Sequence, residues 1–173
     1  MAGAGAEHVQ VDLFPTLVDL AGLPQPPASQ GLEGSSLLPV LQDPAATGAK
    51  SYAFSQYPRC TGFSMYDDPN DYECLTITAS NFSHMGFSVR SQTARYTEWR
   101  AWKRNCVGDF SPDGLVALEL YDHKGDLGAG SHTFDDFEYV NLAYDRAQQA
   151  TVKTLSAVLK EQFDHGDAAS CPR

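Results

Sequence analysis

Residues 85–90, MGFSVR, and residues 95–102, RYTEWRAW, decide the fold of this 173-residue chain. Apolar and polar side chains alternate in both segments, which is the pattern of a strand with one buried face. A short polar connection, residues 91–94, joins them, so the pair predicts an antiparallel hairpin. The same reasoning predicts strands at residues 51–57 and 115–121.

Helices are predicted on both sides of these strands. Apolar residues recur at helical spacing across residues 12–22, with Asp12 as the expected N-cap and Gly22 as the stop. Near the other end, Asp145-x-x-Gln148 fits a capping box that opens a second helix. The core face expected for that helix is Val152, Leu155, Leu159 and Phe163. The chain therefore predicts an α+β fold, a small antiparallel sheet packed by the C-terminal helix with a detached helix at the front.

The composition of the chain limits the classes of function that it can have. The chain has 22 acidic and 12 basic side chains, for a formal net charge of −10, which disfavours nucleic acid as a partner. Hydrophobic residues make up 42% of the chain, enough to bury a core, yet no apolar run approaches the ~20 residues that span a bilayer. Residues 1–6, MAGAGA, have neither the basic nor the apolar region of a signal peptide.

The four cysteines have no C-x-x-C spacing, which disfavours zinc-ribbon and thioredoxin interpretations. In an oxidising compartment, Cys60 and Cys74 would close a loop of about 15 residues, worth roughly 3 kcal/mol. The alternative is four reduced, partly buried thiols. Asn81 begins the glycosylation sequon Asn-Phe-Ser, which also favours an oxidising compartment.

Motifs for catalysis are missing. The sequence has no phosphate loop, no dinucleotide fingerprint and no G-x-S-x-G elbow. His123 and His132 flank a Gly-rich segment and could share a metal, although solvated loop histidines are the favoured interpretation. The paired carboxylates Asp67-Asp68 and Asp135-Asp136 suit turns and helix caps. No catalytic residue and no metal ligand is therefore predicted.

A basic cluster stands out within the predicted hairpin. Five of the twelve basic residues occur in fifteen positions: Arg90, Arg95, Arg100, Lys103 and Arg104. Such a cluster on an acidic body could focus the field toward a small anionic group. The alternative is a solvated face or edge whose charges discourage aggregation.

Several segments together resemble one known family. Residues 11–24, VDLFPTLVDLAGLP, and 32–39, LEGSSLLP, resemble V-D-[LI]-x-P-T-L-x-x-L-A-G and G-x-S-L-x-P-x-L of type I sulfatases with the alkaline-phosphatase-like fold. Later segments recur in the same order in the C-terminal part of the iduronate-2-sulfatase branch: 55–59 (SQYPR), 85–90, 95–99, 119–122 (ELYD) and 138–143 (EYVNLA).

The resemblance implies what this chain lacks. Family enzymes use a cysteine in C-x-[PA]-[ST]-R, converted to formylglycine, and a calcium ion held by aspartates. None of the four cysteines fits that motif, and the family's metal ligands precede the position that matches Asp12. The chain is thus expected to be the C-terminal part of a sulfatase and inactive alone. Its expected partner is the missing N-terminal catalytic region.

The resemblance also assigns parts and roles. Residues 1–44 would be a remnant of the catalytic domain, and residues 45–173 the C-terminal subdomain with a loop insertion at 58–84. The substrate-proximal candidates are Arg90, Arg95, Arg100 and Glu119, although such residues in a small sheet are more often salt-bridge or backbone-binding struts. The expected substrates are sulfated sugars or glycosaminoglycans, in a lysosomal or secreted setting. The alternatives are a non-catalytic module that binds sulfated glycans and an assembly partner that docks through residues 13–21.

Overall fold

The computed structural model describes residues 10–43, 50–60, 74, 78–126 and 136–164. The chain divides into two compact units. The helical unit comprises residues 1–54 and 90–93, and the sheet unit comprises residues 55–89 and 94–173. Among the helices described, none combines the length and the apolar character that crossing a membrane requires.

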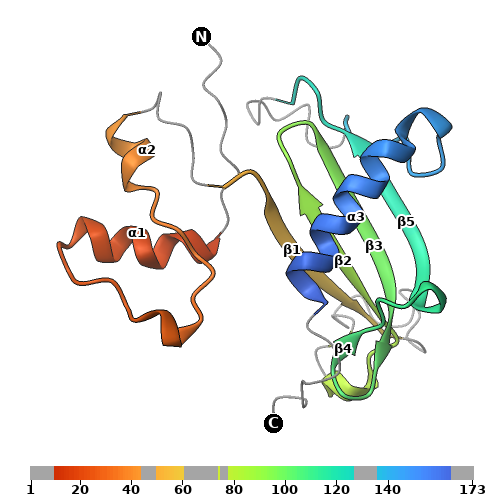
Figure 1. The fold of residues 1–173 in the computed structure, drawn as a ribbon, viewed down its shortest axis with the longest axis horizontal. Helices are drawn as coiled ribbons and strands as arrows, with labels where there is room; N and C mark the ends of the chain where they lie inside the picture. Colours follow the sequence, from red (N-terminus) through yellow and green to blue (C-terminus); the bar gives the residue numbers. More distant parts are fainter. Residues whose placement is uncertain (1–9, 44–49, 61–73, 75–77, 127–135, 165–173) are drawn as a thin grey trace. The chain divides into compact units, whose positions relative to one another are not determined.

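Five strands form the sheet (Figure 1), and four of them lie where the alternating segments predicted strands, whereas the short β4 was not predicted. Their bounds are β1 Ala53–Arg59, β2 His84–Arg90, β3 Ala94–Lys103, β4 Val107–Gly108 and β5 Leu115–Asp122. The strand order is β1-β2-β3-β4, and β5 also pairs with β3. Only three residues, 91–93, join β2 to β3, which confirms the predicted hairpin.

Strand β3 is the centre of the sheet. It pairs antiparallel with β5 from Ala94↔Asp122 to Arg100↔Leu115, with an irregularity between Trp99 and Arg100. Beyond that point it pairs antiparallel with β4. Asn141 covers part of the outer edge of β5, because its side-chain amide donates to Leu118 O and its carbonyl accepts from Leu120 N. The edge is thereby closed to further pairing at these positions.

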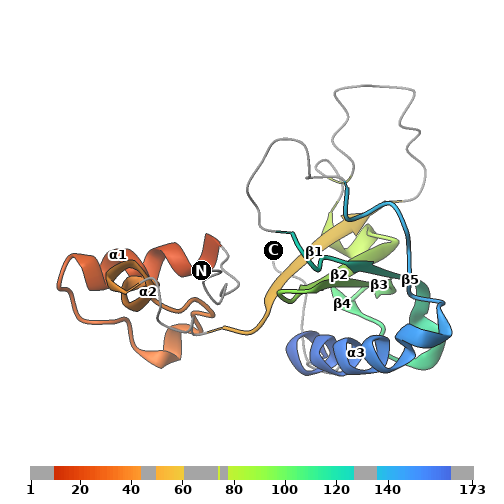
Figure 2. The ribbon, with the colours of Figure 1, turned by 90° about the horizontal axis from the view of Figure 1, so that it is seen from above.

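Helix α3, Gln149–Phe163, lies across one face of the sheet (Figure 2). Its Leu155 and Leu159 are buried, as predicted, whereas Val152 and Phe163 are half-buried. The ring of Phe87 lies 4.8 Å from that of Phe163 and 5.1 Å from that of Phe110. The buried residues that line this core face of the sheet are Met85, Phe87, Val89, Tyr96 and Leu120.

The predicted capping box is only half formed. Asp145 caps as expected, since its carboxylate accepts from Ala147 N at 2.9 Å, but it opens the 3-10 turn η5, Arg146–Gln148. The side chain of Gln149 donates to Asp145 O, and the side chain of Gln148 accepts from Thr151 instead. The reciprocal bond of a capping box does not form, because the Asp145 N–H donates to Leu142 O.

An ion pair is buried on the core face of β3. Arg100 donates through Nε to Glu98 Oε2 at 2.7 Å, and Tyr96 OH donates to Glu98 Oε1 at 2.8 Å. Arg100 also donates to Ser111 O at 2.9 Å, and its guanidinium lies over the ring of Phe110. Burial raises the pKa of Tyr96 well above its usual range, and the charge of Glu98 raises it further.

The helical unit contains η1 Gln10–Asp12, α1 Leu13–Leu20, η2 Ala28–Gln30 and α2 Leu38–Gln42. Helix α1 stops at Gly22 as predicted, because Gly22 adopts φ +65° and Leu23 N then donates to Val18 O. Asp12 occupies the N-cap position of α1, as predicted, but its side chain makes no capping bond. The buried carboxylate of Asp12 instead accepts from Ser35 N at 2.8 Å and Lys50 Nζ at 2.6 Å, which ties the segment after η2 to the helix.

Most of the apolar face of α1 is exposed among the residues that the structure describes. Val18 is buried, but more than half of the surface of four other apolar side chains is exposed: Leu13, Phe14, Leu17 and Leu20. Exposed apolar side chains clustered on one helix face mark a contact surface.

Cys60 and Cys74 form a disulfide. Cys106 is disulfide-bonded as well, so the alternative of reduced thiols fails for these described cysteines. Most of the predicted loop 58–84 lies outside the described residues. Its first residues belong to β1 and its last, His84, begins β2. Between them lies the 3-10 turn η3, Ala79–Asn81, where Asn81 is exposed.

Candidate functional site

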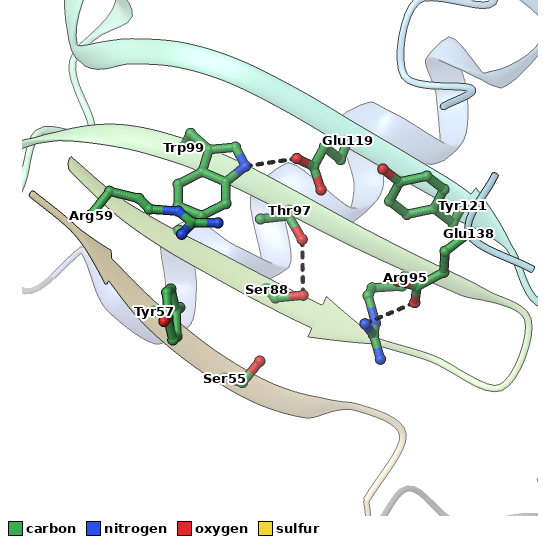
Figure 3. Close-up of a pocket in the computed structure, with 11 residues that line it drawn as sticks. Ser55, Tyr57, Arg59, Ser88, Arg95, Thr97, Trp99, Glu119, Tyr121 and Glu138 are labelled. Atoms are coloured by element: carbon green, nitrogen blue, oxygen red, sulfur yellow. Dashed lines mark hydrogen bonds and ion pairs between the residues drawn. The ribbon is translucent and has the colours of Figure 1, made fainter. Parts of the chain in front are cut away.

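The face of the sheet opposite α3 carries a polar groove of about 240 Å³ (Figure 3). Strand alternation places every second residue there. The residues that line it are Ser55, Tyr57 and Arg59 of β1, Gly86 and Ser88 of β2, Arg95, Thr97 and Trp99 of β3, Glu119 and Tyr121 of β5, and Glu138. The groove therefore combines two guanidinium groups, two carboxylates, three aliphatic hydroxyl groups and three aromatic rings, two of which are phenols.

Trp99 and Arg59 form a stack at one end of the groove (Figure 3). The Arg59 guanidinium lies 5.3 Å from the centre of the Trp99 ring and 5.1 Å from the ring of Tyr57. Gly86 makes room for the indole, because a Cβ at that position would lie 2.9 Å from the ring. Trp99 Nε1 donates to Glu119 Oε1 at 2.9 Å, so both the face and the edge of the indole are fixed.

Arg95 and Glu138 form an ion pair at the other end, with 2.7 Å between Nη1 and Oε1. Behind this pair, His123 is 97% buried and stacks on Phe137. Its Nδ1 lies 2.9 Å from Asp126 Oδ2. Its Nε2 lies 3.2 Å from Glu138 Oε1, in a direction that makes no hydrogen bond. His123 and Glu138 therefore form an ion pair only when the imidazole of His123 is protonated.

Tyr121 has a perturbed phenol. Burial raises the pKa of Tyr121, and the negative charges of Glu119 and Glu138 raise it further. A raised pKa means that the fold favours the neutral phenol. The resulting stabilisation is fully present below the usual pKa of about 10 and is lost as the pH rises through the raised value.

Glu119→Gln is therefore expected to lower the pKa of Tyr121 toward its usual value, because the substitution removes one of the two carboxylates. Ultraviolet absorbance of the phenolate, taken as the difference between each protein and its Tyr121→Phe counterpart, isolates this one tyrosine. Glu161→Gln, at an exposed position on α3, serves as the control and should leave the titration unchanged. An identical titration in both variants would show that Glu119 does not act on Tyr121.

The groove brings together some of the predicted substrate-proximal residues and leaves out others. Arg95 and Glu119 line it. Arg100 lies on the core face in the ion pair with Glu98, and Arg90 donates to Ser91 O and is not a lining residue. Arg59 was missed, although the SQYPR segment contains it. Its signal was strand alternation, which places Ser55, Tyr57 and Arg59 on one face.

Metal binding finds no support among the described residues. They contain no group of three or more histidine, cysteine, aspartate or glutamate side chains that could hold a metal ion. The predicted pairing of His123 with His132 cannot be followed, because His132 lies outside the described residues. The lining residues of the groove can donate and accept hydrogen bonds and stack on a ligand, so the arrangement suits binding.

Comparison with known proteins identifies the class. No protein-family model matches the chain. A crystal structure described as a sulfatase from Bacteroides thetaiotaomicron shares its fold, with a TM-score of 0.52 and 25% sequence identity over 87% of this chain and 23% of that one. The chain belongs to the sulfatases and corresponds to the C-terminal part of such an enzyme.

Among sulfatases, the chain is similar to iduronate 2-sulfatase. The mouse and human proteins are each 32% identical to it in an alignment of 133 positions that covers 68% of this chain. The match spans 22% of the length of each relative, so the chain covers less than a quarter of them. Together with the solved structure, these relatives confirm the predicted family and its α+β subdomain of an antiparallel sheet with a C-terminal helix.

Proposed function

We propose that the chain is the C-terminal portion of a sulfatase that hydrolyses sulfate esters of sugars, including sugars in glycosaminoglycans, and that it is not catalytically competent alone. The observation that carries this proposal is the similarity to iduronate 2-sulfatase, whose name places its sulfate on a sugar acid. The role proposed for the sheet unit is to contribute a wall of the substrate cleft.

The residues of this chain do not fit the cofactors proposed for the complete enzyme, which are formylglycine and calcium. Cys60, Cys74 and Cys106 are disulfide-bonded, and Cys171 stands in Cys-Pro-Arg, which is not C-x-[PA]-[ST]-R. The described residues also lack a cluster of metal ligands. The reacting groups are therefore assigned to the region that precedes position 12 in the relatives.

The exposed apolar face of α1 supports association with the catalytic region of a sulfatase. Leu13, Leu17 and Leu20 are between 56% and 62% exposed, and covering them would stabilise an assembled enzyme by the hydrophobic effect. The proposed partner is the N-terminal catalytic region of a sulfatase. The disulfides and the exposed Asn81 support an oxidising compartment, in keeping with a lysosomal or secreted enzyme.

A chimera tests the proposal. These 173 residues replace the matched segment of mouse iduronate 2-sulfatase, and hydrolysis of a sulfate ester is measured. The chimera is expected to be active well above the mouse protein truncated before that segment, whereas the 173-residue chain alone should give no turnover. A soluble, monodisperse chimera no more active than the truncated protein would contradict the proposal, as would turnover by the isolated chain.

One observation favours a second candidate function, a non-catalytic module that binds sulfated glycans. The side chains that line the groove can hydrogen-bond to a ligand and stack on it. The described residues contain no group that could hold a metal ion. This function predicts glycan binding by the isolated chain together with an inactive chimera.

A further inference from the structure

The guanidinium of Arg59 is held in place by two aromatic rings of the groove. Its guanidinium lies against the rings of Trp99 and Tyr57, an arrangement that fixes the plane of the fork (Figure 3). A guanidinium fixed in this way presents its donors in a geometry that matches a carboxylate or a sulfate ester. Because Gly86 and Glu119 fix the indole beneath it, the stack is organised before any ligand binds.

Hydrogen-bonding groups suited to sugar hydroxyls lie beside this stack. Glu119 accepts from Trp99, and a carboxylate has about four acceptor positions, so it can accept from a ligand as well. Thr97 Oγ1 donates to Ser88 Oγ at 3.0 Å on the floor of the groove, where both hydroxyls are half-buried or buried. Groups of this kind orient a ligand in a binding site.

The charge and size of the groove restrict the ligand. Two arginines, Arg59 and Arg95, balance two glutamates, Glu119 and Glu138, among the lining residues. A balanced groove on a chain of net charge −10 disfavours a densely sulfated segment and suits a ring that carries one anionic group. The volume of about 240 Å³ is below the ~300–1,000 Å³ of sites for drug-sized ligands, so it suits a single ring.

We propose that the groove is a subsite for one acidic sugar ring of an oligosaccharide, with the anionic group on Arg59 and the ring hydroxyls on Glu119, Ser88 and Thr97. The proposal rests on the proposed function for the class of ligand, a sugar, and goes beyond it in naming the residues and the single anionic group. The two sources of that group, a carboxylate and a sulfate ester, are separated by the choice of probes.

The test measures binding of three sugars by the 173-residue chain: methyl β-glucuronide, N-acetylglucosamine 6-sulfate and neutral N-acetylglucosamine. A Trp102→Phe background leaves Trp99 as the only tryptophan, so its fluorescence reports on the groove. At least one acidic sugar is expected to bind about tenfold more tightly than the neutral one. The tighter of the two identifies the anionic group, and equal binding of all three sugars, or none, would overturn the proposal.

Substitutions locate the site. Arg59→Ala is expected to remove the preference for the acidic sugar, and Arg59→Lys to remove most of it, because lysine keeps the charge but not the stacked fork. Lys124→Ala is the matched control, since Lys124 has a 73% exposed side chain and does not line the groove. Equal weakening by Arg59→Lys and Lys124→Ala would show non-specific attraction and refute the subsite. If Arg59→Ala fails to fold, the comparison of Arg59→Lys with Lys124→Ala decides whether Arg59 binds the anionic group.

The two proposals fail separately. An active chimera together with a 173-residue chain that binds no acidic sugar would refute the subsite and leave the sulfatase assignment intact. An inactive, folded chimera would refute the assignment whatever the groove binds.

Discussion

Glu98→Ala is expected to lower the free energy of unfolding of the sheet unit by about 3–5 kcal/mol. Glu98 and Arg100 are 1% and 5% exposed, and the carboxylate satisfies both Arg100 Nε and Tyr96 OH. Removing it leaves the Arg100 guanidinium, which lies over Phe110, without its counter-charge, and the Tyr96 hydroxyl without its carboxylate acceptor. Such an uncompensated charge is costly because the core excludes the water that would solvate it.

Two further variants distinguish the cost of an unpaired buried charge from the cost of losing side-chain atoms. Glu98→Met combined with Arg100→Met removes both charges and should recover more than half of the lost stability. Glu138→Ala breaks the exposed pair with Arg95, whose side chains are 31% and 43% exposed, and should cost less than about 1 kcal/mol. Urea unfolding followed by tryptophan fluorescence measures all three. Equal losses for Glu98→Ala and the double variant would contradict the role of the buried charge.

This ion pair also shows where sequence reasoning succeeded and failed. Period-two alternation predicted the strands correctly, because one face of each strand must be apolar. The same alternation separates Arg95 from Arg100, which are an odd number of residues apart and hence on opposite faces of β3. Grouping them by proximity in the chain obscured this. One lines the groove, and the other holds the core together.

Other features of the site could not be predicted, because they depend on the order of strands. The stack of Arg59 on Trp99 requires both β1 and β3 to flank β2, where Gly86 has no side chain to intervene. Glu138 comes from a segment without regular structure, and no periodicity points to its contact with Arg95. Asp12 likewise matched a local cap pattern, but its partners Ser35 and Lys50 lie 23 and 38 residues away.

Gly34→Ala is expected to have the other large effect, a loss of about 3 kcal/mol, the upper end of the cost of overpacking. A Cβ at Gly34 would lie 2.0 Å from the carbonyl oxygen of Val11 and 2.7 Å from its carbonyl carbon. Both atoms belong to the backbone, so no side-chain rotation relieves the clash. The segment after η2 must then move away from α1, which breaks the bonds from Ser35 N to Asp12 and from Leu37 N to Thr16.

Hydrogen exchange of the Ser35 and Leu37 amides reads this prediction directly, since those two N–H groups depend on the contact. A loss of about 3 kcal/mol corresponds to roughly 100-fold faster exchange. Leu32→Ala changes an exposed side chain of the same segment and should alter the exchange by less than threefold, or about 0.5 kcal/mol. Unchanged protection in Gly34→Ala would mean that Val11 and Gly34 are not in contact. The close approach of two backbones would then not explain why the G-x-S-L segment has a glycine at this position.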